Sequence, residues 1–214
     1  MPITRKVASV AFTGAAATAT LGMAMGPAMA TNATTWHIKA AGKGYHGAVK
    51  GKNKGTTKLV DTTHAVTLTC TAANVAGTVP KSNVTATGTS TRLGTLSAAN
   101  FSHCSFLGVT FKAKLNAHAG IWASKFAAGV THGHIKSINA EISGVGNTCK
   151  AKVTGTLPAS FKNVSHAFIV DGGKAATLTI HSPTTGCPII KNGDKAYFQG
   201  TFPVSVPKSL TIST

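Results

Sequence analysis

The residues with the clearest capacity for chemistry are three histidines, His118, His132 and His134. His132 and His134 are two positions apart, so on a β-strand their imidazoles share one face. His118 precedes them by one expected hairpin, and three converging imidazoles would suit Zn²⁺ or Cu²⁺. The chain contains nine histidines, however, and a pair at this spacing arises readily by chance. We therefore interpret the three as surface or structural residues and predict neither a metal nor another cofactor.

Acidic residues are too few to indicate a hydrolase. The chain has four, Asp61, Glu141, Asp171 and Asp194, and they are isolated from one another. Hydrolysis of a glycosidic bond needs two flanking carboxyl groups. The nearest approach to a Gly-x-Ser-x-Gly motif, residues 88–92, ends in arginine, and the sequence has no phosphate-binding glycine loop. We therefore expect no catalytic residues and no enzymatic activity.

Four cysteines, Cys70, Cys104, Cys149 and Cys187, are spaced as two similar pairs. Four cysteines allow three connectivities, and the repeated spacing favours Cys70–Cys104 and Cys149–Cys187. Zinc binding is the alternative, but no two of them have C-x-x-C spacing, and export favours oxidation. Closing loops of this size is worth about 3–4 kcal/mol for each disulfide in the chain-entropy model.

The cysteines lie in segments whose alternation is typical of half-buried β-strands. In residues 149–155 the cysteine, Ala151 and Val153 share one face, and residues 66–70 repeat this plan. Residues 98–104 are expected to form a loop or one helical turn, and Pro203 suggests an edge strand. Further strands are expected at 36–40, 84–87, 92–96, 109–115, 121–126, 130–142, 167–170, 176–181, 196–198, 202–206 and 210–212.

Short strands between glycine turns, without a sustained helical period, predict the fold class. We expect an all-β protein, an antiparallel β-sandwich or barrel-like sandwich stabilised by two disulfides. Residues 61–214 are expected to form a single β domain made of two successive β units, each with its own cross-link.

Residues 1–30 have the features of a cleaved signal peptide. Arg5 and Lys6 precede an uncharged stretch that ends in Ala28-Met29-Ala30, a small-x-small cleavage pattern. A membrane anchor is the alternative, but the stretch is rich in Ala, Thr and Gly rather than Leu or Ile. No later segment is apolar enough to span a bilayer. We therefore expect a secreted, extracellular protein that can also associate with the cell wall.

Lysine dominates the charge of the chain. The 21 basic residues face 4 acidic ones, which gives a formal net charge of +17. Such a chain attracts polyanions. Sequence-specific reading of bases relies on arginine, and stacking relies on exposed aromatic rings, and both are scarce here. We expect non-specific, salt-sensitive contact with anionic wall polymers and no sequence-specific binding of nucleic acid.

The lysines are most concentrated in residues 31–60, among glycines and without an acidic residue before Asp61. We expect this segment to be partly flexible beyond a strand at 36–40. A merely solvated loop is the alternative to a polymer-binding arm. The polyanion-contact candidates are Lys39, Lys43, Lys50, Lys52, Lys54 and Lys58.

The order of the motifs after the leader resembles that of a known group of proteins. The motifs are Leu68-Thr69-Cys70, Phe101–Cys104, the Ile-Ser-Gly and Cys-x-Ala-x-Val-x-Gly run of Ile142–Gly155, Gly186-Cys187 and Gly193-Asp194. Over about residues 60–214 the chain resembles uncharacterised secreted all-β proteins of actinomycete bacteria. The resemblance implies a secreted β protein with two disulfides and assigns no activity.

Two functions follow from the sequence as hypotheses. The first is a secreted non-catalytic β protein that adheres to anionic cell-envelope polymers through its surface lysines. The alternative is a secreted β-sandwich that binds a small ligand between its sheets. A continuous lysine face would favour the first, whereas polar groups facing inward around a wide cleft would favour the second.

Overall fold

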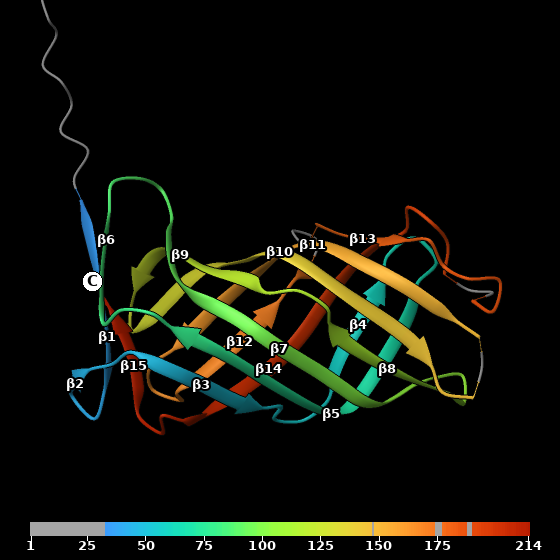
Figure 1. The fold of residues 1–214 in the computed structure, drawn as a ribbon, viewed down its shortest axis with the longest axis horizontal. Coiled ribbons are helices and arrows are strands. Elements are labelled where there is room, and N and C mark those ends of the chain that lie inside the picture. Colours follow the sequence, from blue (N-terminus) through green and yellow to red (C-terminus); the bar gives the residue numbers. More distant parts are fainter. Residues whose placement is uncertain (1–32, 147, 174–176, 188–189) are drawn as a thin grey trace, which may run out of the picture. The chain divides into compact units, whose positions relative to one another are not determined.

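The computed structural model describes residues 33–146, 148–173, 177–187 and 190–214, and the expected signal peptide at residues 1–30 lies outside them. The described residues fold almost entirely into β-strands (Figure 1). They contain no helix with both the length and the apolar character needed to cross a membrane. The all-β class predicted from the strand alternation is therefore confirmed.

Some of the strands are short, and others are long strands of the larger sheet. In chain order they are β1 (Thr34–Ala40), β2 (Lys43–Gly44), β3 (Gly47–Lys52), β4 (Thr57–Asp61), β5 (Val66–Val79), β6 (Asn83–Ala86), β7 (Thr91–Phe106), β8 (Val109–Leu115), β9 (Ala119–Ala127), β10 (Val130–Gly144), β11 (Lys150–Lys162), β12 (Ala167–Asp171), β13 (Thr177–His181), β14 (Lys195–Val206) and β15 (Leu210–Ser213).

Antiparallel pairing arranges these strands in two sheets. In the smaller sheet β1 pairs with β15, β2 and β6. In the larger sheet the pairings run from β5 through β7, β8, β10, β11, β13 and β14 to β4, and β4 pairs again with β5. The larger sheet therefore closes on itself, as a barrel-like sandwich requires.

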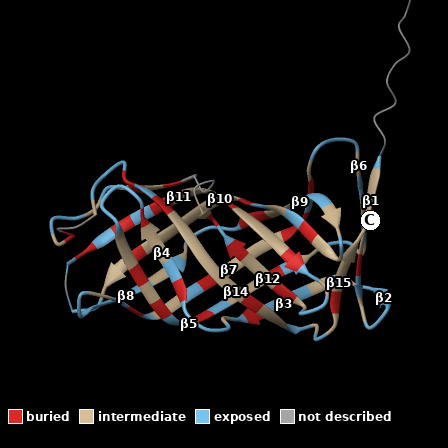
Figure 2. Ribbon diagram, turned by 180° about the vertical axis from the view of Figure 1, so that it is seen from behind, coloured by how far each residue is buried: buried red, intermediate tan, exposed pale blue. Residues whose placement is uncertain are grey.

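Buried residues alternate with more exposed ones along the strands (Figure 2). The main core cluster lies inside the larger sheet and includes Leu68, Val153 and Phe202. A second cluster packs Trp36 of β1 against Leu93 of β7, which attaches the smaller sheet to the larger one. Burying apolar surface in this way is the main favourable term in folding.

Both predicted disulfides are confirmed, Cys70–Cys104 and Cys149–Cys187. Cys70 lies directly opposite Cys104 in the ladder between β5 and β7, so the bond joins neighbouring strands. All four cysteines are buried, and for Cys70 and Cys149 the alternation along the strands predicts this. The two linked parts share one sheet, because β4, which pairs with β5, also pairs with β14.

Two local predictions are wrong. Residues 98–104 belong to β7, where pairing of Ala98 with Ala76 and Ala99 with Val75 outweighs the weak helical preference of the alanines. The expected edge strand at 202–206 is part of β14, which is paired on both sides. Pro203 is accommodated there because the ladder between β14 and β3 is short and shifts register near it.

The structure also corrects the expectation for residues 31–60. Beyond β1, this segment forms β2, β3 and β4, and both β3 and β4 pair with β5 and β14. The glycines of this segment predict flexibility, but Gly51 has a packing role. A Cβ atom at Gly51 would lie 2.9 Å from the carbonyl oxygen of Pro203. The basic segment is thus built into the fold rather than attached to it.

Candidate functional site

The turn between β4 and β5 places a histidine against an aspartate. Asp61 is the last residue of β4 and pairs with Val66 at the start of β5. Its Oδ1 atom accepts hydrogen bonds from the backbone N–H groups of Thr63 at 2.7 Å and His64 at 3.2 Å, the typical use of aspartate in a tight turn. The turn therefore brings the Nδ1 atom of His64 to 3.3 Å from Asp61 Oδ2.

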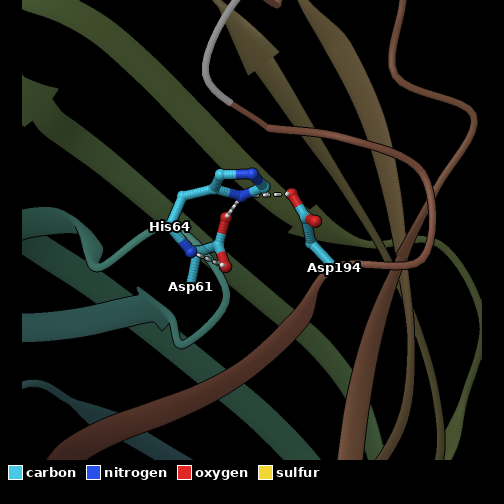
Figure 3. Close-up of side chains that lie close together, drawn as sticks. All are labelled: Asp61, His64 and Asp194. Carbon is cyan, nitrogen blue, oxygen red and sulfur yellow. Dashed lines mark hydrogen bonds and ion pairs between the residues drawn. The ribbon is translucent and has the colours of Figure 1, made fainter.

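A second aspartate reaches the same imidazole from the segment before β14. The Asp194 Oδ2 atom accepts a hydrogen bond from the backbone N–H of Lys191 at 2.5 Å, which fixes the carboxylate. Pairing of β14 with β4 and the hydrogen bond from Thr62 N–H to the carbonyl of Lys195, 2.8 Å long, hold the two connections together. Asp194 Oδ2 consequently lies 3.1 Å from His64 Nδ1 (Figure 3).

Both carboxylates of this cluster are buried, with Asp61 3% and Asp194 5% exposed, whereas the His64 side chain is 32% exposed. Among the described residues, no lysine or arginine nitrogen lies within 4.0 Å of either carboxylate. The histidine is thus their one potential positive partner in that part of the chain. One ligand atom from each residue lies within 4.8 Å of the others, which makes Asp61, His64 and Asp194 a possible metal-binding set.

The sequence does not predict this set, and the expectation that the acidic residues are isolated from one another is wrong for Asp61 and Asp194. Asp61 and Asp194 lie far apart in the chain but converge on His64. The Asp-Thr-Thr-His sequence at 61–64 signals a tight turn, so the nearness of Asp61 and His64 could have been inferred. Nothing in the sequence indicated that Asp194 would join them, because that depends on the pairing of β14 with β4.

The three histidines considered first are not brought together in the same way. His132 and His134 share the outer face of β10, where they line a surface depression with Ser160 and Asp171. His118 is exposed just before β9. Within the described ranges, these histidines do not form a group of three possible ligands as close as that of Asp61, His64 and Asp194.

The six lysines predicted to contact polyanions are all exposed. Lys50 and Lys52 project from β3 and Lys58 from β4. Because β3 and β4 follow each other along β5, these three residues, here called the β3–β4 lysines, lie along one strip of the outer surface. Lys39 and Lys43 belong to paired strands of the smaller sheet, and Lys54 lies in the connection between β3 and β4.

A further lysine group spans three neighbouring strands and was not predicted. In the ladders of β10 with β8 and β11, Glu141 stands between Lys114 and Lys152. Ser143 stands in the same way between Lys112 and Lys150. The β8–β11 lysines are Lys112, Lys114, Lys150 and Lys152. The Lys114–Glu141 contact, 3.9 Å between Nζ and Oε1, is the one lysine–carboxylate ion pair among the described residues.

Core residues line two apolar cavities, one of about 90 Å³ and one of about 100 Å³. Val75, Leu96, Phe168 and Phe202 contribute to both. Every residue that lines the second cavity is apolar. Such cavities can hold only small apolar molecules, since an engineered cavity of about 150 Å³ binds benzene.

No family model, curated protein or solved structure matches this chain.

Proposed function

We propose that the protein is a secreted, non-catalytic β protein that adheres to anionic cell-envelope polymers through its surface lysines. The observation that carries the proposal is the ordered placement of lysines on the outer faces of paired strands. The β3–β4 lysines and the β8–β11 lysines together offer seven ammonium groups on rigid strands, from β3, β4, β8 and β11.

The spacing of these groups suits a long polymer with repeated charges. Neighbouring strands lie about 4.8 Å apart, and alternate residues of one strand about 6.6 Å apart. Lys114 and Lys152, like Lys112 and Lys150, flank β10, so the members of each row lie about 9.6 Å apart and the two rows form a grid of charges. A strand-borne lysine also loses less freedom on binding than one on a flexible arm, because its backbone is already ordered.

The two lysine groups lie on different sides of the closed sheet. Between β4 and β10, the ring of pairings passes through β5, β7 and β8 in one direction and β14, β13 and β11 in the other. One molecule could therefore contact two polymer segments at once. Simultaneous contact would raise the apparent affinity through effective concentration, without stronger individual contacts.

Secretion belongs to the same proposal and is supported by two kinds of observation. Disulfides persist in oxidising compartments, and the structure contains two. The Ala-x-Ala ending of residues 1–30 is the sequence feature that supports export. The resemblance to secreted actinomycete proteins agrees with both.

The proposal is tested by retention of the purified mature protein on an anionic wall polymer and on the same polymer after its charged groups have been removed. We expect retention on the charged polymer alone. Equal retention on both forms would show that the lysines do not drive the interaction.

A carrier of a small apolar ligand is the second candidate function, and the two apolar cavities favour it. Pockets for drug-sized ligands are several times larger, about 300–1,000 Å³. A carrier function would require a hydrocarbon small enough for a cavity of about 100 Å³ to raise the thermal stability of the folded protein by mass action. Replacement of Leu96 by Phe, which narrows both cavities, would then abolish the increase.

A further inference from the structure

We propose that Asp61, His64 and Asp194 form a binding site for a divalent transition-metal ion, with Zn²⁺ as the first candidate. The three residues supply two carboxylate oxygens and one imidazole nitrogen from two connections of the larger sheet. This inference is independent of the lysine surface, since none of the three residues belongs to it.

The distances within the cluster fit the first coordination shell of a small ion. Ligands about 2.0–2.2 Å from Zn²⁺ in a tetrahedron lie about 3.3–3.6 Å from one another, and octahedral neighbours lie slightly closer. His64 Nδ1 lies 3.3 Å from Asp61 Oδ2 and 3.1 Å from Asp194 Oδ2. The ligand atoms of the set all lie within 4.8 Å of one another, so an ion between them requires the two carboxylates to take up the same spacing.

The buried charge of the cluster supplies the driving force. Buried carboxylates are normally paired with cations or coordinate metals, because isolated charges are costly to remove from water. With a neutral imidazole, the described residues leave both Asp61 and Asp194 without a cation. A divalent ion compensates both charges at once, and it also uses the imidazole in the neutral form that metals require.

The surroundings hold the ligands in place before an ion arrives. Two backbone N–H groups bind Asp61 Oδ1, which leaves Oδ2 directed at the imidazole. The N–H of Lys191 fixes the carboxylate of Asp194. Such hydrogen bonds orient metal ligands and raise affinity. The partial exposure of His64 gives the ion a path from solvent.

The donor set selects among metals. Imidazole with carboxylates suits Zn²⁺, Mn²⁺, Fe²⁺ and Co²⁺, whereas Ca²⁺ and Mg²⁺ prefer sites made of oxygen atoms alone. Three protein ligands leave at least one coordination position for water or an anionic group. A bound ion would link the β4–β5 turn to the segment before β14, and so the two halves of the chain.

The experiment uses the full mature chain with its disulfides intact, treated with a chelator that is then removed. Addition of one equivalent of Zn²⁺ should raise the melting temperature, and calorimetry should give one ion per chain. We expect His64→Ala and, separately, Asp194→Asn to lower the affinity for Zn²⁺ at least tenfold. His132→Ala is the matched control and should leave the affinity unchanged, because His132 lies on β10, outside the cluster.

Co²⁺ provides a readout that does not depend on how well the variants fold. Its visible absorption in the wild-type protein should indicate coordination by nitrogen and oxygen, and equimolar Zn²⁺ should abolish it. The proposal is overturned if neither Zn²⁺ nor Co²⁺ binds the wild-type protein. It is equally overturned if binding survives in a folded His64→Ala variant or is lost in His132→Ala.

Discussion

The Nδ1 atom of His64 lies 3.1 Å from the Oδ2 atom of Asp194, although the two residues come from opposite ends of the expected β domain. The contact exists because β14 pairs with β4 and brings the segment before β14 beside the β4–β5 turn. The same pairing closes the larger sheet. The cluster of Asp61, His64 and Asp194 is thus a direct product of the closure.

Removal of the Asp194 carboxylate should destabilise the protein even without a metal. The backbone N–H of Lys191 donates to the buried carboxylate of Asp194, and a hydrogen bond to a charged group contributes about 1.5–3 kcal/mol. We predict that Asp194→Ala lowers the free energy of unfolding by about this amount in urea, in the presence of a chelator. The control is Asp171→Ala, at an exposed position, whose effect should stay within about 0.5 kcal/mol. Equal effects of the two variants would contradict the assigned role of Asp194.

Both disulfides should be essential to stability. Peptide mapping without reduction should recover Cys70 linked to Cys104 and Cys149 linked to Cys187, and no other pairs. Replacing both cysteines of one pair by alanine should lower the free energy of unfolding by about 3–4 kcal/mol, because a long loop is no longer closed in the unfolded chain. Urea unfolding measures the difference. Free thiols or crossed pairs in the purified protein would contradict the structure.

Gly51 tests the position of β3 within the larger sheet. A Cβ at this residue would press on the carbonyl oxygen of Pro203 in β14, at 2.9 Å. We predict that Gly51→Ala destabilises the fold by about 1–3 kcal/mol, the usual cost of overpacking. Ala48→Val, at an exposed position of the same strand, is the control and should have little effect. If both variants are as stable as the wild type, residues 47–52 are not held as described.

How much of the fold the sequence predicts depends on how far apart in the chain the interacting residues lie. Alternation along a strand is local, so the inward faces around Cys70 and Cys149 and the all-β class could be predicted. The sequence also predicts the pairing of the cysteines, because each pair belongs to one of two similar, successive segments. Strand ends and neighbours depend on partners far along the chain. For this reason the sequence predicts a break at residues 98–104 within β7, and two separate strands where the structure has the single strand β14.

The candidate sites show the same division. The prediction of exposed lysines in residues 31–60 relied on composition, and all six are exposed. The sequence does not predict the strands that carry Lys43, Lys50, Lys52 and Lys58. A glycine such as Gly51 looks the same in a sequence whether it lies in a flexible loop or against a neighbouring backbone. The grid around Glu141 and the cluster around His64 both require the register between strands. Turn geometry fixes the register of a hairpin, but no short turn joins β4 to β14 or β8 to β10.

The most direct test of polymer adhesion is the dependence of its binding constant on salt. Contacts between lysines and a polyanion release counterions, so the logarithm of the binding constant should fall steeply and linearly with the logarithm of salt concentration. The slope should be similar for anionic polymers of equal charge density, because Arg92 is the only arginine in the described residues.

The decisive measurement compares this slope for the wild type and for a variant with six lysine-to-glutamine replacements, at Lys39, Lys43, Lys50, Lys52, Lys54 and Lys58. A second variant, with the four β8–β11 lysines replaced, serves as the comparison for the other side of the sheet. We predict that the six replacements flatten the slope while circular dichroism shows an intact fold, since all six side chains are exposed. Retention on the wall polymer that is insensitive to salt, or that survives both sets of replacements, would contradict adhesion through the lysines.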